Sequence, residues 1–168
     1  DEAFIELSDP AQSLVNVRHE NLFIARSLTK SFAVPGIRFG YGFGSPALVS
    51  QMEARRLPWS INAFAEAFAL QAFRQYSTLE TSRLAIAQER SWIVTQLQGM
   101  GIRYTESKAN FLLLHLPSPG KELEKRLLSR GIIIRDCASF GLPNAIRIAI
   151  RTREENKILM EGLQACLL

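Results

Sequence analysis

The run from Ser27 to Tyr41 constrains this chain more than any other segment. It places a hydroxyl at Ser27, an amine at Lys30 and a guanidinium at Arg38 among glycine, proline and small residues. A lysine that forms a Schiff base must be crowded by positive charge or partly withdrawn from water, so that its amine is a nucleophile near neutral pH. A hydroxyl and an arginine fork are donors that a phosphate prefers. The run therefore predicts a lysine site for a phosphorylated aldehyde, with an ordinary solvated turn as the alternative.

Hydrophobic patterning around this run predicts strands and helices of an α/β fold. Residues 22–27 form a short apolar run typical of a parallel strand, and Pro35-Gly36 indicates a turn. Residues 61–100 are compatible with helix almost throughout, and we expect a break near residues 76–78 because such a run is long for one helix. The other predicted elements are strands at 2–7, 38–43, 111–114, 132–134 and 145–150 and helices at 46–56, 120–130 and 153–167. We expect two domains, residues 1–77 and residues 78–168, the second a small α+β unit.

Composition and charge exclude several classes of protein. The chain is 47% hydrophobic and 21% charged, which is typical of a globular protein, and no apolar run is long enough to span a bilayer. The net charge is +4, but bases are interleaved with acids, so we expect no nucleic-acid partner. The two cysteines, Cys137 and Cys166, lack metal-site spacing. We therefore expect no metal, no membrane and a cytoplasmic location.

Two arginines near the end of the chain adjoin apolar runs. Arg147 lies within Ala145-Ile146-Arg147-Ile148-Ala149-Ile150, and Arg135 follows Ile132-Ile133-Ile134. A guanidinium buried in an apolar strand is costly unless it meets an anion. We therefore expect both arginines to bind an anionic ligand, with a salt bridge to an internal acid as the alternative for Arg147.

The lysine segment resembles that of pyridoxal-phosphate (PLP) enzymes of fold type I, the aspartate aminotransferase superfamily. The resemblance covers nearly the whole chain. Further runs that carry it are Asp1-Glu2-Ala3-Phe4-Ile5, Pro58-Trp59-Ser60-Ile61-Asn62-Ala63, Ala109-Asn110-Phe111-Leu112-Leu113-Leu114, Ile134-Arg135-Asp136-Cys137-Ala138 and Ile146-Arg147-Ile148-Ala149-Ile150-Arg151. Within the superfamily the chain is more similar to the threonine-phosphate decarboxylases of cobalamin biosynthesis than to the histidinol-phosphate aminotransferases.

The resemblance implies pyridoxal 5'-phosphate as the cofactor and gives four residues roles toward it. Lys30 binds the cofactor covalently, and Ser27 and Arg38 bind its phosphate. Asp1 pairs with the pyridine nitrogen, and a carboxylate there keeps that nitrogen protonated so that the ring can accept electrons.

The resemblance also implies roles toward the substrate. Arg147 clamps the α-carboxylate, and Arg135 helps to hold a substrate phosphate or carboxylate. Phe4 stands where many aminotransferases carry tyrosine, and it cannot donate a hydrogen bond to the phenolic oxygen of the cofactor. That difference favours the decarboxylases.

The activity implied is decarboxylation of L-threonine O-3-phosphate to (R)-1-amino-2-propanol O-2-phosphate. An aminotransferase such as histidinol-phosphate aminotransferase is the alternative, because cleavage of the Cα–H bond in place of the Cα–carboxylate bond gives transamination. The choice depends on sub-ångström placement of the anion-binding arginines.

Members of this superfamily are about twice as long as this chain, so we expect it to be a C-terminal fragment. Residues 1–77 then end the large PLP-binding domain, and residues 78–168 form the small domain. The other half would carry the glycine-rich phosphate turn, the aromatic residue that stacks on the cofactor and an asparagine. The full-length protein is expected to be a homodimer acting on a phosphorylated amino acid, whereas the fragment alone could be inactive.

Overall fold

The computed structural model describes residues 1–167, and the chain divides into two compact units, residues 1–83 and 84–168. The division falls inside α4 (Leu79–Gly99), six residues after the boundary predicted from the sequence. Each unit has its own hydrophobic cluster. The domain boundary at residue 77 stays a prediction.

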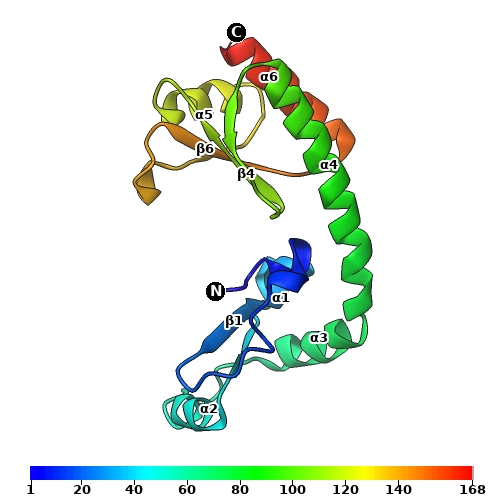
Figure 1. Ribbon diagram of the computed structural model, residues 1–168, viewed down its shortest axis with the longest axis vertical. Helices are drawn as coiled ribbons and strands as arrows, with labels where there is room; N and C mark the ends of the chain where they lie inside the picture. The colour runs from blue at the N-terminus through cyan, green and yellow to red at the C-terminus, as the bar shows by residue number, and fades with distance from the viewer. Residues whose placement is uncertain (168) are drawn as a thin grey trace. The chain divides into compact units, whose positions relative to one another are not determined.

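The first unit is built around a two-stranded antiparallel hairpin (Figure 1). Its elements in chain order are η1 (Ile5–Leu7), η2 (Pro10–Gln12), β1 (Phe23–Ser27), α1 (Leu28–Ser31), η3 (Pro35–Ile37), β2 (Gly40–Gly44), α2 (Pro46–Glu53), α3 (Ala63–Arg74), η4 (Tyr76–Thr78) and the first turn of α4. An isolated hairpin is marginally stable in water, so this one depends on the segments packed against it. Leu28, at the start of α1, is fully buried with Ala69 and Ala72 of α3.

The sequence predicted most of these elements, but two predictions are wrong. Residues 2–7 form a turn and the 3-10 helix η1 instead of a strand. Within this segment, Glu2 N–H donates a hydrogen bond to the Ala25 carbonyl of β1 at 2.8 Å. The strand at residues 22–27 is present as β1, but it pairs antiparallel with β2 and not in parallel. The break near residues 76–78 is confirmed as η4, between α3 and α4.

Small residues decide how closely the segments of this unit approach. A Cβ on Gly42 of β2 would lie 2.7 Å from the Ile24 carbonyl oxygen, so only glycine fits there. On α3 the buried face consists of Ala65, Ala69 and Ala72. Of the phenylalanines of α3, Phe68 is partly buried and packs against this face, whereas Phe64 is 83% exposed.

The second unit is a two-layer α+β structure with an antiparallel sheet in the order β3-β4-β6-β5. Its elements are the remainder of α4, β3 (Arg103–Thr105), β4 (Phe111–His115), α5 (Gly120–Leu128), β5 (Arg135–Asp136), η5 (Ala138–Phe140), β6 (Ala145–Ala149) and α6 (Arg153–Leu167). Apolar side chains of α4, α5 and α6 pack with those of β4 and β6 in one core. The helices therefore cover one face of the sheet (Figure 1).

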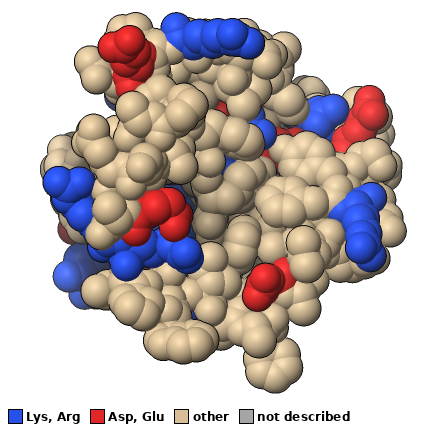
Figure 2. Space-filling view, turned by 90° about the horizontal axis from the view of Figure 1, so that it is seen from below, with Lys and Arg blue, Asp and Glu red and all other residues tan. Residues whose placement is uncertain are grey.

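The predicted α5, β6 and α6 are confirmed within two residues at each end. The strand expected at residues 132–134 is wrong, because the strand begins at Arg135 and Ile133 is 85% exposed. The short strand β3 is not predicted by its polar sequence. No helix in residues 1–167 is long and apolar enough to cross a membrane. The face drawn in Figure 2 carries acidic and basic side chains scattered over a mostly uncharged surface.

Candidate functional site

Lys30 lies on a short helix that continues directly from a strand. β1 ends at Ser27, and α1 begins at the next residue. The Lys30 side chain is exposed, and its Nζ lies 5.9 Å from the centre of the Phe4 ring. Among residues 1–167 no carboxylate lies within ion-pair distance of this amine. The amine is therefore accessible to a ligand, but it is not withdrawn from water as expected from the sequence.

The hydroxyl of Ser27 lies at the start of the lysine turn. Its Oγ is 2.7 Å from Oγ1 of Thr29, which is buried. Because the Thr29 hydroxyl can donate to Ser27, the Ser27 hydroxyl proton is free to reach an external acceptor. Thr29 is thus placed to orient the Ser27 hydroxyl.

Arg38 lies at the other end of the same loop. The strand register pairs Ser27 with Gly40, the first residue of β2, so Arg38 lies two residues before the position that faces Ser27. Its backbone is left-handed, with φ 55°, and its Nη1 donates to the Pro35 carbonyl at 3.2 Å. The side chain is exposed, and no acid in the described chain pairs with it. Two hydrogen-bond donors suited to a phosphate, the Ser27 hydroxyl and the Arg38 guanidinium, thus lie at the two ends of one hairpin loop.

Asp1 lies beside this hairpin but not in a strand. Its carboxylate is exposed and accepts a hydrogen bond from Ala3 N–H at 2.9 Å. The next residue, Glu2, donates its N–H to Ala25 of β1. This anchor holds Asp1 next to β1, three residues before the Phe4 ring that contacts Lys30.

Arg26 precedes Ser27 in the chain, but its guanidinium is engaged by other groups. Its guanidinium lies 3.0 Å from the Glu2 carboxylate and 3.6 Å from the Glu6 carboxylate. It also donates to the Ser13 hydroxyl at 2.7 Å and to the Tyr76 hydroxyl at 3.2 Å. Its charge is neutralised by two acids, so we do not assign it to a phosphate.

Sequence reasoning missed the buried carboxylate in this network. Glu6 is 2% exposed and accepts hydrogen bonds from Tyr41 Oη at 2.8 Å, Tyr76 Oη at 3.1 Å and Ser31 Oγ at 3.1 Å. Burial raises the pKa of the Tyr41 phenol, and the hydrogen bond to Glu6 raises it further. Burial and the Glu6 charge likewise raise the pKa of Tyr76. Both hydroxyls therefore remain protonated donors. The signal in the sequence was a single acid within the apolar stretch Phe4-Ile5-Glu6-Leu7.

Arg135 and Arg147 face each other in the second unit. They are register partners on the neighbouring strands β5 and β6. The premise that Arg147 is buried is wrong: its neighbours Ile146 and Ile148 are buried, but Arg147 is exposed on the opposite face of the sheet. The guanidinium carbon of Arg147 lies 5.1 Å from the Phe111 ring centre, and that of Arg135 lies 5.6 Å from the Phe140 ring centre.

No acid within residues 1–167 pairs with either arginine, so the salt bridge considered for Arg147 is not found. Like charges directly opposite each other destabilise an antiparallel pair. An anion bound between them would remove that repulsion and accept hydrogen bonds from both guanidinium groups. The pair therefore forms a candidate anion site.

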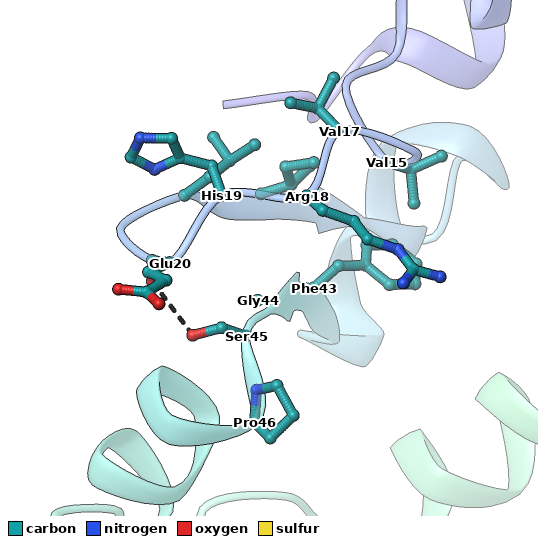
Figure 3. A pocket seen from close by; sticks show the side chains of 11 residues that line it. Val15, Val17, Arg18, His19, Glu20, Phe43, Gly44, Ser45 and Pro46 are labelled. Atoms are coloured by element: carbon teal, nitrogen blue, oxygen red, sulfur yellow. Dashed lines mark hydrogen bonds between the residues drawn. The ribbon is translucent and has the colours of Figure 1, made fainter.

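A hollow of about 530 Å³ lies elsewhere in the first unit and contains none of the predicted site residues. Figure 3 shows the loop of residues 15–20 opposite the end of β2, joined to it by a hydrogen bond from the Ser45 hydroxyl to the Glu20 carbonyl at 3.0 Å. The lining combines apolar side chains with Arg18, Glu20 and His19, and His19 Nδ1 accepts a hydrogen bond from Asn21 N–H of its own loop. No group of metal-ligating side chains is found in the part of the chain that the structure describes.

Comparison with known proteins identifies the class to which this arrangement belongs. Residues 1–163 match the family described as "Aminotransferase class I and II". The chain therefore belongs to this family of PLP-dependent enzymes.

Two curated relatives and one solved structure are similar over almost the whole chain. A protein of Caldanaerobacter subterraneus subsp. tengcongensis, provisionally named a threonine-phosphate decarboxylase, is 37% identical over 98% of this chain and 47% of its own length. The histidinol-phosphate aminotransferase of Symbiobacterium thermophilum is 34% identical over 99% of this chain and 47% of its own length. The crystal structure of the histidinol-phosphate aminotransferase from Clostridium acetobutylicum superposes with a TM-score of 0.91 at 37% identity, covering 98% of this chain and 52% of that chain.

The chain thus spans about half the length of the curated relatives it matches. Its first unit offers an exposed amine, a hydroxyl and an exposed guanidinium, and neither the amine nor the guanidinium has an acidic partner in the described residues. These are the groups needed to bind an aldehyde that carries a phosphate. The donor set therefore fits pyridoxal 5'-phosphate.

Proposed function

We propose that the protein containing this chain decarboxylates L-threonine O-3-phosphate to (R)-1-amino-2-propanol O-2-phosphate, a step in cobalamin biosynthesis. The observation that carries this proposal is the pair Arg135 and Arg147, which face each other without an acidic partner. Two arginines at paired positions of neighbouring strands suit a substrate with two anionic groups, and threonine phosphate has a carboxylate and a phosphate. The similarity to the Caldanaerobacter protein supports the same substrate.

Pyridoxal 5'-phosphate, when bound, supplies an electron sink for the bond broken at the substrate Cα. Lys30 would hold its aldehyde carbon, and the Lys30 amine, once displaced by the substrate amine, would donate the proton that Cα gains when CO₂ leaves. Ser27 and Arg38 bind the phosphate, one from each end of the hairpin loop. Asp1 holds a proton at the pyridine nitrogen.

Arg147 binds the α-carboxylate of the substrate, and Arg135 binds its phosphate. Each guanidinium lies against an aromatic ring, which limits the orientations of the fork. Phe4 supports decarboxylation over transamination, because the ring near Lys30 has no hydroxyl to bind the phenolic oxygen of the cofactor.

Transamination of a phosphorylated amine such as histidinol phosphate is the second candidate, and the similarity to two histidinol-phosphate aminotransferases favours it. The test is to supply the full-length protein with threonine phosphate and measure CO₂ and pyridoxamine phosphate. Release of CO₂ without pyridoxamine phosphate is the expected result. Pyridoxamine phosphate without CO₂ would overturn the decarboxylase in favour of the aminotransferase.

The proposal includes a cytoplasmic homodimer as the full-length form. It also includes the possibility that the 168-residue chain is inactive without its other half. A PLP absorbance titration of this chain, followed by borohydride reduction and peptide mapping, tests that point. A visible band with the adduct on Lys30 would show that this chain builds the lysine site without its other half, and adducts spread over surface lysines would show that it does not.

A further inference from the structure

The lysine turn α1 is too short to fix its own geometry. It contains four residues, and helix nucleation is unfavourable for a segment of this length, so its orientation comes from its tertiary contacts. One contact is the burial of Leu28 and Thr29 at its start. The other is made by Ser31, the residue after Lys30, whose hydroxyl lies 3.1 Å from Glu6 Oε2 and 3.3 Å from the Ser27 carbonyl oxygen.

Glu6 is the common acceptor for segments that surround this turn. It lies on η1 and binds Ser31 of α1, Tyr41 of β2 and Tyr76 of η4. The main-chain carbonyl of Glu6 also accepts a hydrogen bond from Arg83 at 3.3 Å. A buried network in which every donor is satisfied holds its members in a single arrangement.

Glu6 is also two residues from the Phe4 ring that lies near the Lys30 amine. Residues 4–6 therefore contact Lys30 through Phe4 and hold the following residue, Ser31, through Glu6. We propose that Glu6 is a positioning residue, which orients the Lys30 amine through the Ser31 hydroxyl. This inference rests on the proposed role of Lys30 as the residue that binds the cofactor.

A second route from Glu6 to Lys30 must be separated from this one. Glu6 also neutralises Arg26, so its loss could act through the charge of Arg26 instead of through Ser31. Glu2 offers the matched control, because its carboxylate pairs with Arg26 at 3.0 Å but does not contact Ser31. Ser8 offers a control for hydroxyl loss next to η1, because its Oγ donates to the Ile5 carbonyl and not to Glu6.

The experiment measures the rate at which Lys30 captures pyridoxal in the full-length protein. Pyridoxal lacks the phosphate, so Ser27 and Arg38 do not contribute to its binding. Borohydride trapping and peptide mass mapping give the rate at Lys30 alone. Small misplacements of a reacting group can cost up to about 100-fold in rate. We expect Glu6→Gln and Ser31→Ala to slow capture at least about tenfold, and Glu2→Gln and Ser8→Ala to stay within about twofold of wild type.

Two results would overturn the inference. Capture by Ser31→Ala at the wild-type rate would show that the hydroxyl does not orient Lys30, and this variant keeps the test valid even if Glu6→Gln does not fold. Slowing by Glu2→Gln equal to that by Glu6→Gln would assign the effect to the Arg26 charge. Failure of wild-type protein to react at Lys30 would instead overturn the proposed function, and the inference with it.

Discussion

The facing arginines of the second unit lead to a quantitative prediction about charge. Arg135 and Arg147 are direct register partners, and like charges in that position destabilise an antiparallel pair by roughly 0.2–1 kcal/mol. Replacing one arginine also removes its contact with Phe111 or Phe140, which is worth about 0.5–1 kcal/mol at an exposed site. The two effects nearly cancel, so a single substitution gives a change in stability close to zero.

A double-mutant cycle isolates the repulsion. Urea unfolding of the full-length protein at low salt compares Arg135→Gln, Arg147→Gln and the double variant. The dependence of the free energy of unfolding on urea concentration must be the same for all of them. We expect a repulsive coupling of about 0.5 kcal/mol between the two arginines. Saturating phosphate should turn this into an attractive coupling of about 1–3 kcal/mol, because charge-assisted hydrogen bonds to one anion then join the two side chains.

Chloride at matched ionic strength is the control for screening, which should only reduce the repulsion toward zero. Arg103→Gln combined with Arg147→Gln is the control for geometry, because Arg103 faces His115 across β3 and β4 and should show no coupling to Arg147. A coupling between Arg135 and Arg147 that has the same sign in phosphate and in chloride would refute the anion site.

Three further predictions concern stability and need only unfolding measurements. Gly42→Ala should destabilise by about 1–3 kcal/mol, because its Cβ meets a main-chain carbonyl at 2.7 Å, whereas Gly36→Ala, with open space around it, should change little; equal effects would refute the close approach. Asn156→Ala should lower the free energy of unfolding by about 2–4 kcal/mol, because the fully buried amide accepts a hydrogen bond from Arg151 N–H and donates one to the Arg151 carbonyl. The control Gln164→Ala, at an exposed position of the same helix, should leave the free energy of unfolding unchanged. The Arg151 ion pair lowers the pKa of Glu155 to about 2, so its contribution is present above pH 4.5 and is lost as the pH falls toward 2. The difference in melting temperature between wild type and Glu155→Gln should therefore shrink over that range, and a constant difference would contradict it.

Much of the fold follows from local sequence signals. Ser45-Pro46 predicts the start of α2, and the Ser45 hydroxyl does accept a hydrogen bond from Leu48 N–H. The break between α3 and α4 follows from the length of the helical run, since few helices reach forty residues. These features depend on neighbours in the chain, which a sequence displays directly.

The errors occur where distant segments decide the outcome. Residues 2–7 alternate like a strand, but the carboxylate of Glu6 is drawn to donors from α1, β2 and η4, up to 70 residues away. Ile132-Ile133-Ile134 is apolar enough for a strand, yet the ladder begins only at Arg135, where β6 provides a partner. Local propensity cannot show which segment will supply hydrogen-bond partners.

Part of the candidate site follows from local sequence, and part depends on segments that are distant in the chain. Ser27, Lys30 and Arg38 could be selected from the sequence because they lie on one short run, and the hairpin register explains why they occur together. Arg147 was selected for a wrong reason, since it is exposed and not buried. Its significance comes from Arg135 on the neighbouring strand, a pairing that only the sheet register shows.

The loop between Ser27 and Arg38 also has a thermodynamic consequence. Its two ends carry the residues proposed to bind one phosphate, so a bound phosphate would hold the two ends of the loop together. Closure of β1 against β2 and uptake of the cofactor are then linked equilibria, and each favours the other to the same extent. Newly made protein that lacks the cofactor should open this loop more often, expose its backbone to proteases and be cleared sooner than loaded protein. The supply of cofactor would then set not only how much of the protein is active but also how much of it survives.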